Sequence, residues 1–337
     1  MTLRWASDPI LPDYDVKVLP LPAEDDGELV ATLLRKSCGR ESRRAFLYVH
    51  GYLDYFFHDH VASAVCEAGF DFYALELRRY GRSLRGKNRP NYCTKLDHYF
   101  VEITQAIDVA IADGHDSVVL YGHSTGGLIA SLYADRGERR AQLSAVVLNS
   151  PFFEFAITSA QRLTLSIALL LGGVAPWLSD RKGVSPHYGD SIHNSQRGEW
   201  KYDLRWKPIR GFPTYFGWAR AIKQGHKQVQ RGLSIQQPVL MLHSDASGGG
   251  KEWSDAFFTR DIVLKIEHMR AYGGGLGARV TRIEIPGAIH DVMLSRAPVR
   301  QHALLKMVDW MRATVSADRP NLPQVLAGRP SVTPSLA

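Results

Sequence analysis

Cysteine is scarce in this sequence and follows no recognisable pattern. The 337 residues contain three cysteines, Cys38, Cys66 and Cys93. Their number is odd and their spacing matches no metal-binding motif, so we expect reduced thiols, no metal site and a cytoplasmic location. The sequence also starts without the basic region and apolar run of a secretory leader, and we therefore expect no signal peptide.

The sequence has no uninterrupted apolar run of the length that a bilayer requires. Residues 163–178 are mostly apolar, but Gly172, Gly173 and Pro176 interrupt them. A membrane-spanning helix needs about 20 consecutive apolar residues. We therefore expect a buried or lid helix in this stretch. The alternative is peripheral contact between this segment and a lipid surface.

The charge is moderately positive, and one segment is especially basic. The formal net charge is +7, and 22% of the residues are charged. No nucleic-acid-binding motif accompanies this charge, so we exclude nucleic acid as a partner. The densest basic cluster consists of Arg78, Arg79, Arg82, Arg85, Lys87 and Arg89. We interpret it as a solvated basic loop, and the alternative is attraction of an anionic substrate or lipid surface.

Short apolar runs alternate with helical patterns from residue 45 to residue 150. We expect strands at 45–49, 70–77, 118–121 and 145–149, and helices at 60–68 and 96–112. We also expect a strand pair at 13–20 and 29–35, later strands at 237–243 and 279–285, and helices at 261–271 and 297–314. This order predicts an α/β fold with a mostly parallel eight-stranded sheet and helices on both faces.

The regular alternation stops between residues 153 and 236, where the sequence becomes rich in aromatic side chains. We expect this stretch to be a helical cap inserted into a core formed by residues 1–152 and 237–317. Residues 318–337 contain several prolines, and their few apolar residues follow no period. We expect this tail to be disordered.

A Gly-x-Ser-x-Gly pattern lies at residues 122–126, between an expected strand and an expected helix. Such a pattern arises by chance in roughly one chain in six, so its context is what carries the argument. A strand, a sharp turn and a helix would expose Ser124 at the edge of the sheet. The start of the helix would point free N–H groups towards an oxyanion at that place. Ser124 is therefore the candidate nucleophile.

A serine hydroxyl needs a base, and His290 is the best candidate. It follows the last expected strand, in a turn that begins at Pro286 and Gly287. Two other histidines flank expected site loops. We expect His123 to point away from Ser124 and to pack, and His50 to brace the loop that follows its strand.

The acid that orients this base should follow the strand at 237–243 and precede His290. Three aspartates satisfy this order: Asp245, Asp255 and Asp261. We favour Asp261, at the start of an expected helix, with Asp245 as the alternative, whereas Asp255 has no supporting feature. Asp291 directly follows His290, and we interpret it as a helix cap.

Two backbone N–H groups are needed to bind the oxyanion. The residue after the nucleophile, Thr125, supplies one of them. Tyr52 is placed to supply the other, because it follows the expected strand at 45–49 by way of His50 and Gly51.

Four motifs together resemble those of α/β-hydrolases of the monoglyceride-lipase and serine-aminopeptidase-like (lysophospholipase-like) group. They are Val-His-Gly at 49–51, Glu-Leu-Arg-Arg-Tyr-Gly-Arg-Ser at 76–83, Gly-His-Ser-Thr-Gly-Gly at 122–127 and Ile-His-Asp at 289–291. The sequence departs from the group at Glu76 and Arg79, which replace the usual Asp and Gly. It also lacks the acid motif L-H-G-x-x-D. The D-x-V-V form of that group is better met at 261–264 than directly after the strand.

The resemblance implies a serine hydrolase that cleaves a carboxylic ester through an acyl-enzyme on Ser124. An apolar acyl ester or an aromatic ester is the expected substrate, since the expected cap is aromatic. No metal or organic cofactor is implied. The alternatives are a peptidase, amidase, thioesterase or acyltransferase with the same triad, or a non-catalytic binding protein on the same fold.

Overall fold

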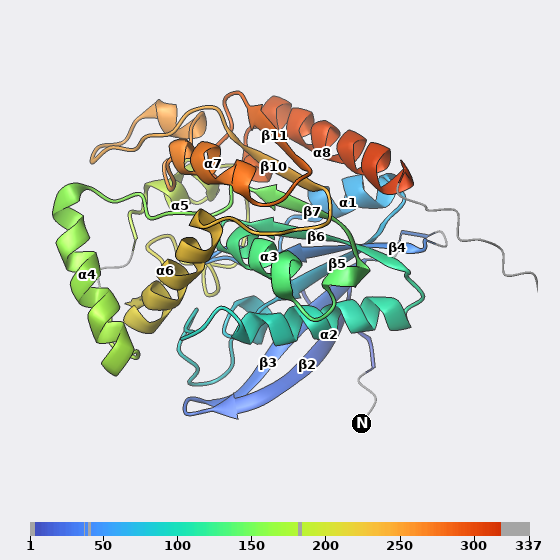
Figure 1. Cartoon of the computed structure of the whole chain (residues 1–337), viewed down its shortest axis with the longest axis horizontal. Coiled ribbons are helices and arrows are strands. Elements are labelled where there is room, and N and C mark those ends of the chain that lie inside the picture. The colour runs from blue at the N-terminus through green and yellow to red at the C-terminus, as the bar shows by residue number, and fades with distance from the viewer. Residues whose placement is uncertain (1–3, 37, 40–41, 181–183, 318–337) are drawn as a thin grey trace, which may run out of the picture.

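Within the described residues, a mixed sheet of nine strands forms the centre of the molecule (Figure 1). The computed structural model describes residues 4–36, 38–39, 42–180 and 184–317. The parallel part of the sheet consists of β5 (Asp71–Glu76), β4 (Arg44–Val49), β6 (Ser117–His123), β7 (Leu143–Asn149), β10 (Val239–Ser244) and β11 (Val280–Ile285), in this order. Except for β11 at the edge, which is mostly exposed or half-buried, these strands are almost entirely buried and mainly apolar, as expected for strands covered on both faces.

Antiparallel strands complete one edge of the sheet. They are β1 (Ala6–Ser7), β2 (Asp15–Glu24) and β3 (Gly27–Lys36), and β3 pairs with β5. The predicted fold class is confirmed, but the predicted count of eight strands was too low. The two-residue strand β1 was missed because so short a segment leaves no alternating pattern in the sequence.

Helices cover both faces of the sheet, as predicted (Figure 1). On one face, α1 (Asp59–Glu67) and α8 (Ala297–Ala317) pack on a core that includes Phe46, Phe72 and Tyr121. On the other face, α2 (His98–Ala112) and α3 (Thr125–Arg136) pack on a second core. The loops that follow the parallel strands therefore meet at one edge, which is where α/β sheets bind ligands.

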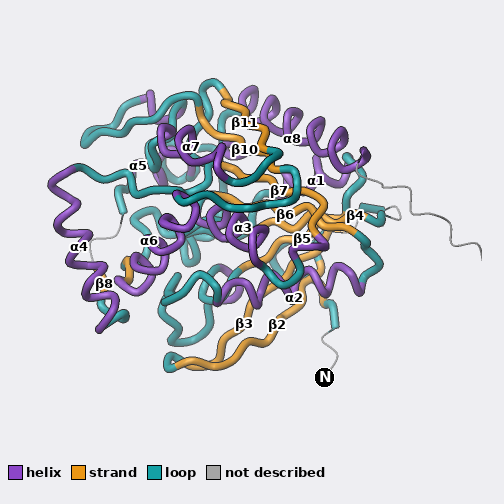
Figure 2. Tube along the Cα trace, in the orientation of Figure 1, coloured by secondary structure: helices purple, strands orange, loops and turns teal. Residues whose placement is uncertain are grey.

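The chain between β7 and β10 forms the cap segment, defined here as residues 153–236. It contains α4 (Ser159–Val174), β8 (Ser179–Asp180), α5 (His187–Ile192), β9 (Thr214–Tyr215) and α6 (Phe216–Gln230). Figure 2 shows α4 beside α6, on the side of α6 away from the sheet. The division into core and cap domains stays a prediction, and the predicted disordered tail at 318–337 lies outside the described residues.

Helix α4 is not buried, although burial was one of the two expectations for this stretch. Leu163, Leu170 and Val174 are 70%, 71% and 73% exposed. The opposite face of α4 packs closely on α6, because a Cβ on Gly172 would lie 2.3 Å from the carbonyl oxygen of Phe216. Within the described part of the chain, no helix is long and apolar enough to cross a membrane.

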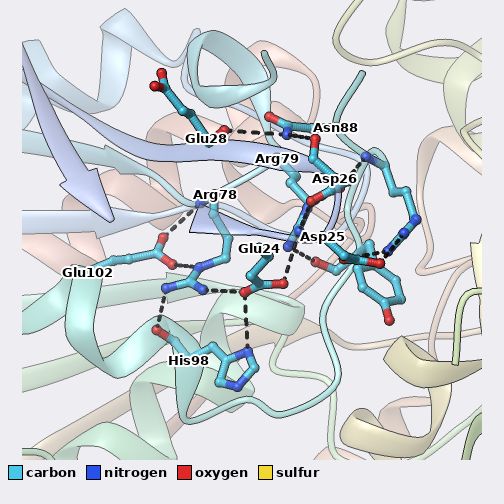
Figure 3. Close-up of polar contacts among 11 residues, drawn as sticks. Glu24, Asp25, Asp26, Glu28, Arg78, Arg79, Asn88, His98 and Glu102 are labelled. Atoms are coloured by element: carbon cyan, nitrogen blue, oxygen red, sulfur yellow. Dashed lines mark hydrogen bonds and ion pairs between the residues drawn. The ribbon is translucent and has the colours of Figure 1, made fainter. Parts of the chain in front are cut away.

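The expected solvated basic loop is partly buried instead. Arg78 and Arg79 are buried, and both form ion pairs with Glu24 at the end of β2 (Figure 3). Arg78 also pairs with Glu102 of α2, and Arg79 pairs with Asp26. Arg82 and Arg89 are half-buried, and Arg85 and Lys87 are exposed. The sequence interpretation failed because the neutralising carboxylates lie far away along the chain.

Cys38 and Cys66 form a disulfide, with their Cα atoms 5.1 Å apart. The prediction of reduced thiols is therefore wrong for these two residues. It holds for Cys93, which is free and buried. The spacing of the cysteines could not reveal this pair, because the bond joins the segment after β3 to the last turn of α1. The expectation of a cytoplasmic location loses its basis in reduced thiols, since disulfides persist in oxidising compartments.

Candidate active site

Ser124 lies at the sharp turn between β6 and α3. Its φ of 51° falls in the left-handed region, which side chains rarely adopt. Glycine is required on both sides of it. A Cβ on Gly122 would lie 2.3 Å from the carbonyl oxygen of Gly126, and a Cβ on Gly126 would lie 2.3 Å from that of His50. This strained geometry is typical of functional sites and lifts the Ser124 hydroxyl from the sheet edge.

His290 joins Ser124 to Asp261. Its Nε2 lies 3.0 Å from Ser124 Oγ, and its Nδ1 lies 2.9 Å from Asp261 Oδ2. A carboxylate only accepts hydrogen bonds, so Nδ1 carries the proton and Nε2 is free to accept from the hydroxyl. All three side chains are buried. The sequence-predicted nucleophile, base and acid are thus brought into one hydrogen-bonded chain.

Asp261 reaches this position by a backbone detour. The chain leaves the end of β10, makes an excursion and returns, so that Asp261 N donates to Ala246 O at 2.9 Å and Gly248 N donates to Asp261 O at 2.9 Å. The second carboxylate oxygen, Oδ1, accepts from the backbone N–H groups of Val263 and Leu264. The predicted helix from residue 261 is wrong in its start, because α7 spans Ile266–Tyr272.

The two other candidate acids do not meet His290. Asp245 is exposed, and its Oδ1 accepts from Gly287 N at 3.0 Å. Asp255 lies in a short 3-10 helix and accepts from the indole of Trp253. The geometry therefore selects Asp261 among the three aspartates.

The candidate oxyanion donors lie beside the nucleophile. Thr125 is the first residue of α3. The β4–α1 loop, residues 50–58, packs against the turn: a Cβ on Gly51 would lie 3.2 Å from Ser124 Cβ. Tyr52 follows directly in this loop. A helix start and a tightly packed loop thus present backbone groups at one place, although the role of these N–H groups stays a proposal.

His50 braces the β4–α1 loop, as predicted. Its Nε2 accepts from Leu77 N at 3.1 Å, so its Nδ1 carries the proton and donates to Gly51 O at 2.8 Å. Burial lowers the pKa of His50 to about 4. His123 directs its Nε2 towards Asp291, 3.9 Å away, and burial likewise lowers the pKa of His123 to about 4. Both imidazoles are therefore neutral at physiological pH.

Sequence analysis missed a second buried polar cluster, centred on Asp291. Its Oδ1 accepts from Asn149 Nδ2 at 2.7 Å and from Met293 N at 3.0 Å, and its Oδ2 meets His58 Nε2 at 2.9 Å. The expected helix cap is present in the bond from Met293. Although burial by itself raises the pKa of Asp291, the neighbouring His123 and His58 hold it well below its ordinary value. No local pattern could have indicated these distant partners.

A pocket of about 490 Å³ opens onto Ser124 and His290. Its apolar lining comes mainly from the cap segment, from Phe152 just before it and from residues 262–264, with Phe155, Ile192, Ile209 and Trp218 among the larger side chains. A second cavity, of about 940 Å³, shares residues 262–264 with the first pocket. Its lining also includes Lys251, Lys265 and Glu267. Ser124 lines only the smaller, apolar pocket, which therefore is the candidate substrate site.

The sheet order, the strained turn and the segment inserted after β7 define an α/β-hydrolase fold. A soluble variant of monoglyceride lipase from Saccharomyces cerevisiae, solved with a substrate analog, is similar with a TM-score of 0.65 and 16% identity over 88% of this chain and 96% of that chain. The monoacylglycerol lipase of Paleococcus ferrophilus is similar with a TM-score of 0.63 and 22% identity over 84% of this chain and 99% of that chain. A thermostable carboxyl esterase from Bacillus coagulans, in complex with glycerol, is similar with a TM-score of 0.63 and 16% identity over 89% of this chain and 99% of that chain.

These identities establish the fold alone. The family is established separately by sequence, since the pattern of the family described as serine aminopeptidase, S33, matches residues 40–293. The chain belongs to this family of α/β-hydrolases.

Proposed function

We propose that this protein is a serine hydrolase that cleaves carboxylic esters through an acyl-enzyme on Ser124. The observation that carries the proposal is the hydrogen-bonded chain from Asp261 through His290 to Ser124 at the wall of an apolar pocket. Ser124 Oγ attacks the ester carbonyl while His290 Nε2 takes its proton. Asp261 keeps the imidazole in the required tautomer and stabilises its positive charge.

The oxyanion that forms is held by the backbone N–H groups of Tyr52 and Thr125. Losing one such donor typically costs about a hundredfold to a thousandfold in rate. His290 then returns its proton to the leaving alcohol, whose C–O bond breaks. In the second half, His290 activates a water that attacks the acyl-enzyme, and Ser124 is released as the free hydroxyl.

The pocket supports an ester with an apolar acyl chain or an aromatic group. Its described lining residues include no carboxylate, and Lys207 is its lysine. An aminopeptidase needs a negative group to bind the charged amino terminus of its substrate, and the described lining of this pocket supplies none. The lipases and the esterase of similar fold act on esters according to their names. We therefore place ester cleavage ahead of peptide, amide or thioester cleavage.

Labelling with a fluorophosphonate tests the nucleophile. The intact mass of the wild type should rise by one adduct, and Ser124→Ala should stay unlabelled. Ser150→Ala is the matched control, because Ser150 also follows a strand of the sheet, is buried and has a left-handed φ of 46°. Labelling of Ser124→Ala, or none of the wild type, would refute the proposal. A series of p-nitrophenyl esters of increasing chain length should then show a maximum in kcat/KM that an aminoacyl-anilide series lacks.

We further propose that α4 rests on a lipid surface, from which an apolar ester enters the pocket. Leu163, Ile167, Leu170 and Val174 recur at helical spacing and are exposed. Gln161 in the first turn of α4 lines the pocket, so α4 begins beside the pocket. In flotation with phosphatidylcholine vesicles, Leu163→Glu/Leu170→Glu should lose binding. Leu305→Glu, at an exposed leucine of α8, should retain it. Equal binding by all three proteins would contradict this role of α4.

A further inference from the structure

The cap segment contacts the β4–α1 loop, and the first of these contacts is at Tyr52. The Tyr52 ring stacks on Trp218 of α6, with ring centroids 4.0 Å apart. Its hydroxyl donates to Thr214 Oγ1 at 3.2 Å. The residue whose backbone N–H is proposed to bind the oxyanion is therefore fixed through its side chain by the cap.

The next residue, Leu53, has a strained backbone that the cap maintains. Its φ of 55° is rare for a residue with a branched side chain. Such a conformation costs about 1–3 kcal/mol and persists only when the surroundings enforce it. The Leu53 side chain packs on Gly211 of the cap segment, where a Cβ would lie 2.6 Å from Leu53 Cδ1. A side chain at 211 would therefore displace the Leu53 side chain, and the φ of 69° at 211 also favours glycine.

Asp54 forms a buried ion pair with Lys207 of the cap segment. Lys207 Nζ lies 2.7 Å from Asp54 Oδ1, and the two side chains are 10% and 2% exposed. The other oxygen of Asp54, Oδ2, has no hydrogen-bond partner among the described residues. The carboxylates of Asp54 and Asp291 lie close to one another and to His58. Without Lys207, the buried charge of Asp54 would be left unpaired beside another carboxylate.

Tyr55 completes the series. Its hydroxyl accepts from Asp203 N at 2.6 Å, and its ring packs edge-on against Trp206. Four consecutive residues of the β4–α1 loop, 52–55, thus each contact residues between 203 and 218 of the cap segment. The cap segment thus contacts every residue in the middle of this loop.

We propose that the cap positions the oxyanion-binding loop, with Lys207 as the positioning residue that holds Asp54 and thereby the Tyr52 N–H in place. This inference rests on the function proposed above. It implies that the oxyanion hole is complete only while residues 203–218 are seated on the loop. Seating of the cap and stabilisation of the transition state then become one event rather than two.

Replacing Lys207 with methionine tests this role. We expect kcat per active site for p-nitrophenyl butyrate to fall about tenfold to a hundredfold, with KM changed less than about twofold. Active sites are counted by stoichiometric labelling with a fluorophosphonate, so unfolded protein does not contribute. The inhibition constant of a trifluoromethyl ketone, which forms a tetrahedral adduct, should rise by the factor by which kcat/KM falls. A merely structural residue would lower the number of active sites and leave these ratios unchanged.

The matched control is Lys223→Met, because Lys223 of α6 pairs with Glu154 at the same distance of 2.7 Å away from the loop. It should keep the wild-type kcat per active site. The double variant Asp54→Asn/Lys207→Met should return to within about fivefold of the wild type, since neither charge is then unpaired. If Lys207→Met raises KM and leaves kcat unchanged, or if Lys223→Met loses as much activity, the inference is wrong.

A second variant covers the case in which Lys207→Met does not fold. Gly211→Ala should push Leu53 away and lower kcat per active site at constant KM. Its control is Gly232→Ala, where φ is also positive but the nearest atom to a Cβ is 3.6 Å away. Wild-type kcat in Gly211→Ala would overturn the inference. A wild type that neither reacts with the fluorophosphonate nor hydrolyses the ester would instead overturn the proposed function, so the two failures are distinct.

Discussion

Two buried aspartate–histidine pairs lie near each other in this protein and have nearly the same geometry. In the first, Asp261 Oδ2 lies 2.9 Å from His290 Nδ1. In the second, Asp291 Oδ2 lies 2.9 Å from His58 Nε2. Each aspartate also accepts backbone N–H bonds with its other oxygen. The two pairs differ locally in the ring nitrogen that meets the carboxylate, Nδ1 of His290 and Nε2 of His58.

The pairs differ in what the far nitrogen of each imidazole meets. His290 faces Ser124 Oγ at 3.0 Å, in a strained turn that lines the apolar pocket. His58 faces the hydroxyl of Tyr48 at 3.3 Å, and the Tyr48 side chain is fully buried in β4. Both pairs therefore show the order carboxylate, imidazole, hydroxyl. Only the Ser124 hydroxyl lies at a strained backbone turn and can be reached from the pocket. A relay of this kind becomes a reaction centre only where a substrate can reach the hydroxyl.

The largest expected effect comes from removing the charge of the first pair. Asp261→Asn should lower kcat for p-nitrophenyl butyrate about a thousandfold to ten-thousandfold, because the imidazole then loses the partner that fixes its tautomer. Asp245→Asn is the control, since Asp245 is exposed and contacts Gly287 instead. If Asp245→Asn abolished activity and Asp261→Asn did not, the assignment of the acid would be wrong.

The first pair could be predicted in large part from the sequence because its cues are local. The glycines around Ser124 and the turn before His290 stand next to the residues that they position. Asp261 was preferred over Asp245 on the form of residues 261–264, and its carboxylate does meet His290. The excursion that brings it back to the end of β10 was not predictable. It depends on backbone hydrogen bonds between residues 246–248 and Asp261, and the spacing of apolar residues in the sequence does not indicate such bonds.

The second pair and the cap contacts could not be predicted because their partners are distant along the chain. Asp54 and Lys207 are 153 residues apart, and Arg79 and Asp26 are 53 apart. From sequence alone, a charged residue is interpreted as solvated unless an opposite charge lies near it along the chain. The buried arginines were misread for the same reason. Elements with their own periodicity were predicted well, whereas contacts made only by tertiary folding were not.

The second pair should matter for stability where the first matters for rate. Asp291→Asn should lower the free energy of unfolding at pH 7 by about 3 kcal/mol, because it disrupts a buried hydrogen-bonded carboxylate. The folded pKa of Asp291 lies below its unfolded value of about 4, so the ionised form stabilises the fold above about pH 4. This contribution is lost as the pH falls below that value. Urea unfolding at pH 7, 5 and 3.5 should show a constant difference from the wild type at the first two values and a smaller one at the third.

The same variant sharpens the comparison through its activity. Per active site, Asp291→Asn should retain kcat within about tenfold of the wild type, far above Asp261→Asn. A loss as large as that of Asp261→Asn would mean that both pairs serve the reaction. Unchanged stability at pH 7 would mean that the second pair has no role in holding the fold.

A smaller effect is expected at His60, whose ring lies 6.1 Å from that of His58. Burial lowers the pKa of His60 to about 4, below its unfolded value of about 6.5. Between these values the unfolded chain takes up a proton that the folded chain does not, so stability falls as the pH is lowered. His60→Gln should reduce the loss of unfolding free energy between pH 7 and pH 5 by about 2 kcal/mol. His302→Gln, at an exposed histidine of α8, should leave that loss unchanged.

The smallest effect is expected at the hydroxyl of the second pair. Burial raises the pKa of Tyr48 well above its ordinary value, so its hydroxyl stays protonated and can only share a hydrogen bond with His58. Tyr48→Phe should therefore cost about 1 kcal/mol of unfolding free energy and change kcat less than about twofold. Tyr121→Phe is the matched variant, since the Tyr121 ring stacks on Tyr48 and its hydroxyl accepts from Asn149. A drop in kcat confined to Tyr48→Phe would show that the Tyr48 hydroxyl takes part in the reaction although substrate cannot reach it. The contrast between the two aspartate–histidine pairs would then be wrong.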